Sequence, residues 1–174
     1  MPSLPRRQTI DCATGQITYR QSDGDADAMP VICLHGIGGD DTSFAAQFNG
    51  CGDRRVIAWN MPGYAGSARM DPMDFGGLAT RVTDLMDALG ITRAHLVGQS
   101  IGGMIAQEVA IRTPDRVAGL GLIATVSAFG GRDDSFKNAF LKARLAPLDA
   151  STSMARLAKD GIGSARRKSV GPRL

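Results

Sequence analysis

The sequence predicts an α/β fold, a mostly parallel sheet with helices on both faces. Two observations lead to this prediction. Short apolar runs rich in valine and isoleucine alternate along the chain with segments of helical periodicity, which is the pattern produced by strand–helix–strand units. Most of the candidate strands are also apolar along their length, as expected when helices bury both faces of a sheet.

Five strands are expected, in chain order. The first, Gln16–Arg20, alternates polar and apolar residues as an edge strand does. The other four are short, mainly apolar runs that fit inner strands: Val31–Leu34, Val56–Trp59, His95–Val97 and Val117–Ile123.

Two helices are expected between these strands. The first is amphipathic and ends at Gly90, with one apolar face made of Leu78, Val82, Leu85, Met86 and Leu89. The second, Ile101–Arg112, is apolar around more of its circumference and ends before Pro114. It should therefore lie against the sheet with little solvent contact.

The pattern divides the chain into three parts. Residues 1–131 carry the core strands and helices, residues 132–160 continue with a mixed helical pattern and no new strand, and residues 161–174 lose apolar periodicity and should be disordered. The formal charge of +3 comes from this tail, because without its four basic residues the chain has 16 basic and 17 acidic residues. The globular part is not basic, which argues against nucleic acid as a partner.

Composition also indicates the compartment. Cys12, Cys33 and Cys51 are odd in number and lack the spacing of metal ligands, which predicts reduced thiols in a cytoplasmic protein. Met1–Ile10 has two arginines but no apolar stretch after them, unlike a secretory signal. No apolar run reaches the roughly 20 residues that cross a bilayer, so no membrane association is expected.

The strongest functional signal is the pentapeptide Gly98-Gln99-Ser100-Ile101-Gly102. It lies directly between a predicted strand and a predicted helix, where a G-x-S-x-G sequence forms the sharp turn called the nucleophile elbow and raises its serine above the sheet. Such a serine has a strained backbone conformation that costs about 1–3 kcal/mol. Glycines at 98 and 102 would avoid collisions across the turn. A plain Gly-Ser connection is the alternative interpretation.

A second signal is the glycine-rich loop His35-Gly36-Ile37-Gly38-Gly39, straight after the strand Val31–Leu34. In acyl transfer the developing oxyanion needs two backbone N–H donors, one from such a loop and one from the residue after the nucleophile. The candidates are the amides of Ile37 and Ile101. An anion-binding nest or a plain turn remains possible, although the loop lacks both the dinucleotide-binding and the P-loop spacing.

The third segment, Trp59–Ser67, reads Trp-Asn-Met-Pro-Gly-Tyr-Ala-Gly-Ser. With the two motifs above, in this order, the chain resembles the α/β-hydrolase superfamily over roughly residues 16 to 160, in particular its small bacterial esterase, lactonase and perhydrolase-like members. The family usually reads D-x-P-G-x-G-x-S in this segment. This chain has Asn60 for the acid and Ala65 for the second glycine, which brings the loop geometry into question but not the nucleophile.

The resemblance implies an incomplete α/β-hydrolase fold, with 132–160 as the start of a helical cap. It implies Ser100 as nucleophile, Ile37 and Ile101 as oxyanion donors, a small carboxylic ester or lactone as substrate, and no metal or organic cofactor. Relatives that act on haloalkanes or epoxides carry an aspartate at the elbow, so Ser100 favours ester, thioester or lactone chemistry.

The triad acid and histidine are not found. His95 precedes Ser100 on an extended strand, about 16 Å away at ~3.3 Å per residue, and His35 is expected to hydrogen-bond the backbone of its own loop. Asp133 and Asp134 lie at the entry to the cap and are poor candidates for the acid. We therefore expect a truncated or frame-shifted product of a longer hydrolase gene, inactive alone.

Two further expectations follow. Because a complete family member continues with two more strands and a closing helix, Val117–Ile123 should be an exposed apolar edge through which the chain self-associates. A non-catalytic small-molecule binding protein with a hydrolase-like pocket is the alternative function.

Overall fold

The computed structural model describes residues 4–127, 135, 138–139, 141–142 and 146. The description below concerns the unit Met1–Ser127, which is one of two units in the chain. Of the predicted cap 132–160, only the few described residues between 135 and 146 can be assigned, and they are helical. The predicted tail 161–174 lies outside the described residues.

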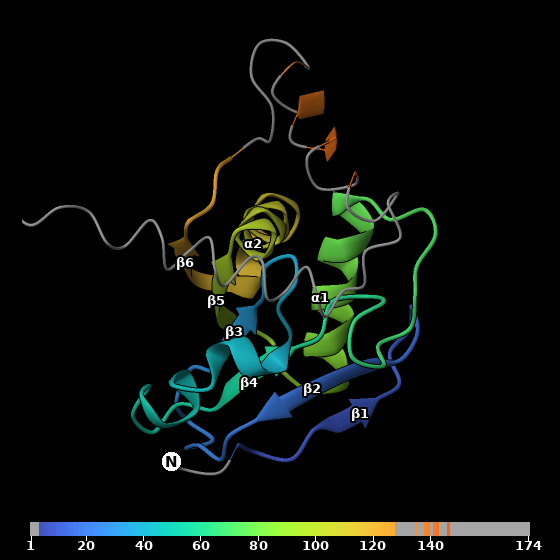
Figure 1. Ribbon diagram of the computed structural model, residues 1–174. Helices are drawn as coiled ribbons and strands as arrows, with labels where there is room; N and C mark the ends of the chain where they lie inside the picture. The colour runs from blue at the N-terminus through green and yellow to red at the C-terminus, as the bar shows by residue number, and fades with distance from the viewer. Residues whose placement is uncertain (1–3, 128–134, 136–137, 140, 143–145, 147–174) are drawn as a thin grey trace, which may run out of the picture. The chain divides into compact units, whose positions relative to one another are not determined.

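Six strands form one sheet in the order β1-β2-β4-β3-β5-β6 (Figure 1). Their bounds are β1 Gln8–Ile10, β2 Ile17–Gln21, β3 Val31–Leu34, β4 Val56–Trp59, β5 Ala94–Gln99 and β6 Val117–Ile123. β1 and β2 pair antiparallel, as do β2 and β4, whereas β4, β3, β5 and β6 are parallel to one another. The predicted mostly parallel sheet is confirmed.

The strand predictions are confirmed with small shifts. β3, β4 and β6 have the predicted bounds, β2 lies one residue later, and β5 is longer than predicted at both ends. β1 was not expected from the sequence, because its three residues carry no apolar alternation and it forms by pairing with β2 (Gln8 opposite Tyr19).

Both helices are confirmed. α1 spans Phe75–Ala88, and the side chain of its N-cap Asp74 accepts a hydrogen bond from the Gly77 amide at 2.7 Å, a capping bond worth about 1 kcal/mol. α2 spans Ile101–Arg112, as predicted. α1 and α2 pack side by side on one face of the sheet (Figure 1), and the short 3-10 helices η1 (Asp41–Phe44) and η2 (Gln47–Asn49) cover the other face.

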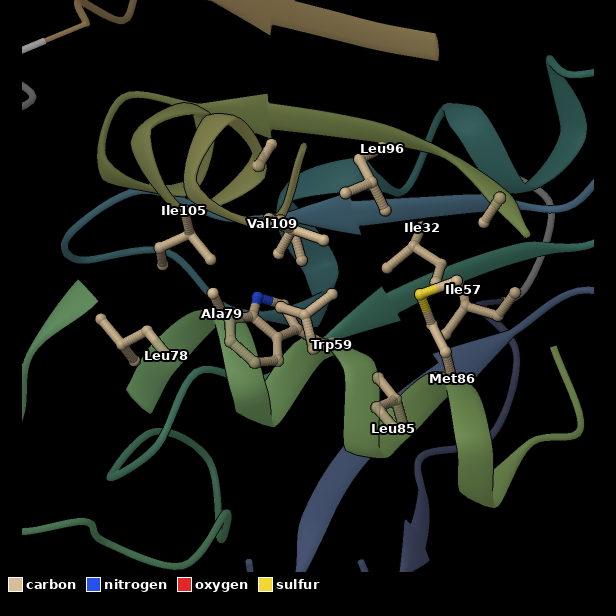
Figure 2. Packing of buried hydrophobic residues seen from close by; sticks show 14 of the residues in the cluster. Ile32, Ile57, Trp59, Leu78, Ala79, Leu85, Met86, Leu96, Ile105 and Val109 are labelled. Carbon is tan, nitrogen blue, oxygen red and sulfur yellow. The ribbon is translucent and has the colours of Figure 1, made fainter. Parts of the chain in front are cut away.

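The main core lies between the sheet and the two helices. Figure 2 shows the Trp59 indole of β4 between Ala79 of α1 and Val109 of α2, all fully or almost fully buried. Each large apolar side chain buried in this way contributes about 1.5–3 kcal/mol. The second core, under η1 and η2, includes Cys33, Phe44 and Phe48. The two cores pack against opposite faces of the sheet. The loops that follow β3, β4 and β5 begin at the carboxyl ends of these strands.

No helix in the described part of the chain has both the length and the apolar character of a membrane span.

Candidate active site

Ser100 lies at the sharp junction between the end of β5 and the start of α2. Its backbone has φ 52° and ψ −119°, which is a conformation that residues other than glycine rarely adopt and that costs about 1–3 kcal/mol. The residue is exposed at the carboxyl edge of the parallel strands. The strained bend expected at this position is therefore present, and Ser100 belongs to neither a regular strand nor a regular helix.

The glycines on either side of Ser100 are required by close backbone approaches. A Cβ atom on Gly98 would lie 2.3 Å from the carbonyl oxygen of Gly102, and one on Gly102 would lie 2.1 Å from that of Leu34. Both distances are impossible for real atoms, so the elbow can form only with glycine at 98 and 102. The expected collision across the turn is confirmed for Gly98, whereas at Gly102 the collision is with the Leu34 carbonyl at the end of β3.

Hydrogen bonds hold the bend from both sides. The Ser100 amide donates to the Ile123 carbonyl at the end of β6, at 2.9 Å. The Ser100 carbonyl accepts from the Gly103 amide at 2.9 Å and from the Thr125 hydroxyl at 2.7 Å. The energy stored in the strained backbone is thus offset by bonds to α2 and to the segment after β6.

The loop after β3 lies directly beside the elbow. A Cβ atom on Gly36 would come within 3.3 Å of the Ser100 Cβ, so the two backbones are close neighbours. The Ile37 side chain is 61% exposed, and Gly38 has φ 80°. Ile101 is the first residue of α2, and first-turn amides have no acceptor within their own helix. In residues 4–127 neither the Ile37 nor the Ile101 amide donates to a loop, turn or side chain.

His35 is enclosed by backbone groups. Its Nε2 accepts a hydrogen bond from the Met61 amide at 3.0 Å, and its Nδ1 lies 2.9 Å from the Gly36 carbonyl. Since Nε2 is the acceptor, the proton is on Nδ1, which donates to Gly36. Burial lowers the pKa of this fully buried imidazole below 6.5. His35 binds loop backbone, as the sequence predicts, and neither ring nitrogen is free to take a proton from Ser100.

His95 lies at the other end of β5. It pairs with Val31, the first residue of β3, whereas Ser100 follows the last residue of β5. A cleft of about 430 Å³ also lies at this amino end, where residues 24–30 and 89–93 line it together with Arg55. It does not reach Ser100. Asp133 and Asp134 lie outside the described residues.

Asn60, which stands where the family usually has an acid, is the centre of a buried polar network. Its Nδ2 donates to the Asp41 carboxylate and to the Thr18 hydroxyl, both at 2.9 Å, and its Oδ1 accepts from the Asp41 amide at 2.8 Å. An aspartate could not donate to Asp41. The asparagine is therefore matched to the buried carboxylate of η1, next to the loop 35–39.

The Asp41 carboxylate is also paired with two arginines. Arg7 bonds it at 2.5 and 2.8 Å and Arg20 at 3.1 Å. Burial by itself raises the pKa of this carboxyl, but the hydrogen bonds from Arg7, Asn60 and Arg20 outweigh it and hold the pKa below 3.8. This network fixes η1 against β2 and β4 and so limits where the loop 35–39 can lie.

The turn after β4 carries the second departure from the family pattern, Ala65, within a hydrogen-bonded loop. Ala65 has φ 47°, between Gly63 at φ 82° and Gly66 at φ 99°. The Ser67 amide donates to the Tyr64 carbonyl at 2.8 Å, and the Ser67 hydroxyl donates to the Asn60 carbonyl at 2.7 Å. The turn thus holds an alanine in a left-handed conformation where the family pattern has glycine.

No group of three or more His, Cys, Asp or Glu side chains is placed to bind a metal within the described residues. Cys12, Cys33 and Cys51 are free, and burial raises the pKa of the Cys33 thiol to about 12. Cys33 is fully buried and is thus a small core residue.

Comparison with known proteins agrees with this architecture. The family model of the alpha/beta hydrolase fold matches residues 29–158, and the chain belongs to this family. A hydrolase from Pseudomonas aeruginosa PA01 superposes with a TM-score of 0.77, at 25% identity, over 96% of this chain and 63% of that one.

Two further relatives indicate the range of chemistry in the family. The structure of the N-acyl homoserine lactonase AidH, complexed with N-butanoyl homoserine, has a TM-score of 0.62 and 32% identity over 69% of this chain and 45% of that one. The dihydrolipoyllysine-residue acetyltransferase component of the acetoin cleaving system of Pseudomonas putida is 38% identical over 104 residues, 59% of this chain and 28% of that protein. The chain spans from about a quarter to about a half of the length of the curated relatives it matches.

Proposed function

We propose that this chain carries the nucleophile of a serine hydrolase that acts on a small carboxylic ester or lactone. The observation that carries the proposal is the conformation of Ser100, whose φ of 52° is held between β5 and α2 by Ile123 and Thr125. Strain of this kind, maintained by surrounding bonds, is characteristic of functional sites. The family's hydrolase chemistry supports the same reaction class.

In the proposed reaction the Ser100 hydroxyl attacks the substrate carbonyl carbon. The C=O π bond becomes a C–O⁻ as the serine oxygen forms its bond, and the serine proton leaves to a base. The C=O bond then re-forms as the alkoxide of the ester, or the ring oxygen of a lactone, leaves and takes up that proton, which gives the acyl-serine. The amides of Ile37 and Ile101 would donate to the oxyanion. Losing one such donor typically lowers the rate by about 10²–10³, so these two amides would carry much of the residual activity.

The base is the element that the described residues do not provide. Both ring nitrogens of His35 are bonded to backbone, and His95 is at the far end of its strand. We therefore expect slow single acylation of Ser100 in this chain and no efficient turnover, since oxyanion-hole and binding contributions alone give roughly 10³–10⁴ over water.

The substrate class is proposed from relatives. The lactonase AidH supports a lactone with a short acyl chain, and the acetyltransferase component supports acyl transfer through a related site. The three free cysteines support a cytoplasmic location for this protein.

The test is covalent labelling with a fluorophosphonate, followed by mass spectrometry of the modified peptide. The proposal predicts one adduct, on Ser100, that is lost in Ser100→Ala. Ser127→Ala removes another exposed serine and should leave labelling unchanged. Labelling of a different residue, or none, would contradict the proposal.

A non-catalytic binding protein is the second candidate, and it is favoured by the full engagement of His35 with backbone groups. It predicts no labelling of Ser100 together with saturable binding of N-butanoyl homoserine lactone in calorimetry. The hydrolase proposal predicts labelling whatever the affinity for that lactone.

A further inference from the structure

The carbonyl of Ser100 receives more hydrogen bonds than the start of a helix requires. The Gly103 and Met104 amides donate to it at 2.9 and 3.3 Å, as the first turn of α2 dictates. The Thr125 hydroxyl adds a third and shorter bond, 2.7 Å long, from a position 25 residues further along the chain. This third bond comes from outside the helix and has no role in helix formation.

This bond is significant because the peptide unit that carries the Ser100 carbonyl also carries the Ile101 N–H. The Ser100–Ile101 peptide is trans, since the cis bond of the chain's described residues is Asp71–Pro72. In a planar trans peptide the carbonyl and the N–H point in opposite directions and rotate together. A hydroxyl that holds the Ser100 carbonyl therefore also sets the direction of the Ile101 N–H.

Thr125 is itself held in place. We call Ile123–Val126, at and just beyond the end of β6, the exit segment. Ala124 has φ 46°, so the chain leaves the extended conformation directly after β6, and the Gln107 side chain donates to the Val126 carbonyl at 3.2 Å. A Cβ on Gly103 would lie 2.6 Å from the Thr125 Cβ, so α2 approaches Thr125 as closely as glycine permits.

The exit segment therefore contacts the elbow at both ends of Ser100. The Ile123 carbonyl accepts from the Ser100 amide, and the Thr125 hydroxyl donates to the Ser100 carbonyl. The backbone of Ser100 is fixed on both sides by one short segment, which is partly buried at Thr125 and carries no charge. A strained residue persists only where its surroundings over-determine it. Among the described residues, Thr125 is the one whose side chain hydrogen-bonds the Ser100 backbone.

We propose that Thr125 is a positioning residue of the oxyanion hole, which orients the Ile101 N–H through the Ser100 carbonyl. This role rests on the proposed function, in which Ser100 is the nucleophile and Ile101 an oxyanion donor. Thr125 contacts no reacting atom. It is a determinant of the rate of acylation and not of substrate affinity.

The test compares three variants of the full chain. Thr125→Val removes the hydroxyl and keeps the shape, and Thr125→Ser restores it. The matched control is Thr113→Val at the other end of α2, because the Thr113 hydroxyl donates to the Val109 carbonyl at 3.0 Å. Thr113→Val also loses a bond from a threonine hydroxyl to a backbone carbonyl of α2, but at the opposite end of the helix from Ser100.

The first readout is the kinetics of fluorophosphonate labelling, separated into probe affinity and maximal rate. We expect Thr125→Val to lower the maximal rate by about tenfold, part of the 10²–10³ that a lost donor costs, with probe affinity unchanged. Thr125→Ser and Thr113→Val should keep the wild-type rate. Equal rates in Thr125→Val and wild type would overturn the proposal, as would an equal loss in Thr113→Val.

The second readout does not need a reactive serine. The ¹⁵N order parameter of the Ile101 amide should fall in Thr125→Val and remain at the wild-type value in Thr125→Ser and Thr113→Val. If the wild-type chain is not labelled at all, the proposed function fails, and the Ile101 amide alone decides the role of Thr125. An Ile101 amide equally rigid in Thr125→Val would refute that role.

Discussion

At the scale of single residues, His35 illustrates how burial removes a histidine from acid–base chemistry. The imidazole is next to the loop that approaches Ser100, yet Nδ1 donates to Gly36 and Nε2 accepts from Met61. Burial favours the neutral ring, and so lowers the pKa, because a charged imidazolium would lose its hydration. Protonation would also break the bond from the Met61 amide.

The lowered pKa predicts a dependence of stability on pH. The pKa of His35 lies below 6.5 in the folded chain and near 6.5 in the unfolded chain, so below about pH 6.5 the unfolded chain binds a proton that the folded chain excludes. The free energy of unfolding should therefore fall as pH drops from about 7 to about 5, measured by urea denaturation at several pH values.

His35→Gln should be less stable than wild type at pH 7 but should lose most of this slope. His95→Gln removes the other histidine and should keep it. A wild-type slope that survives unchanged in His35→Gln would show that other groups control stability in this range.

At the scale of elements, the turn after β4 explains the two departures from the family pattern. Asn60 donates to Asp41, which an aspartate could not do, and Ala65 occupies a left-handed position where the family has glycine. The hydrogen bonds of the turn, such as that from the Ser67 amide to the Tyr64 carbonyl, hold Ala65 in its strained conformation.

The strain at Ala65 predicts that Ala65→Gly stabilises the chain. A left-handed backbone costs a residue with a Cβ roughly 1–2 kcal/mol, and the greater entropy of glycine in the unfolded chain cancels about 0.4–1 kcal/mol of the gain. The free energy of unfolding should rise by about 0.5–1 kcal/mol in chemical denaturation. Ala68→Gly, in the same loop but without positive φ, should lower it. Destabilisation by both variants would contradict the strain at Ala65.

The elements themselves were largely predictable from the sequence, and the reason is periodicity. β3, β4, β6 and α2 are apolar runs with clear turn residues at their ends, and their bounds agree with the structure. β1 depends on pairing with β2, and η1 depends on the capping box of Asp40 and Ser43. Apolar periodicity predicts neither β1 nor η1, although a search for helix caps could find the Asp40–Ser43 spacing.

The site was predictable in part for a similar reason. The glycines at 98 and 102 and the bend at Ser100 follow from local sterics, which a pentapeptide encodes. The bond from Thr125 and the network around Asp41 join residues far apart in sequence. Such contacts form only in the folded chain, so no local sequence motif predicts them. The catalytic roles of Ser100, Ile37 and Ile101 stay predictions.

At the scale of the whole described unit, the two edges of the sheet differ in how their outer strands are covered. The β2 side is capped by the short β1, while no strand among residues 4–127 pairs with the outer edge of β6. Leu120, Leu122 and Ile123 are 42–47% exposed, and no charged residue lies in β6. Natural edge strands are usually protected by charge, proline or a bulge.

We therefore propose that the chain self-associates through β6. Sedimentation velocity should show concentration-dependent oligomers of the wild type, and Leu122→Lys should shift the chain toward monomer because a charge at the edge opposes strand pairing. Ile111→Lys, on the exposed side of α2, is the control and should leave the oligomers unchanged. A wild-type chain that stays monomeric at high concentration would refute the proposal.

The proposed function requires that the bend at position 100 presents a hydroxyl to two amide donors at the carboxyl edge of a parallel sheet. The most direct measurement is the crystal structure of the fluorophosphonate adduct. We predict a covalent bond from the Ser100 Oγ to phosphorus, with the phosphoryl oxygen about 2.7–3.1 Å from the Ile37 and Ile101 nitrogens. An adduct whose phosphoryl oxygen points to solvent, away from both amides, would contradict the proposed roles of Ile37 and Ile101.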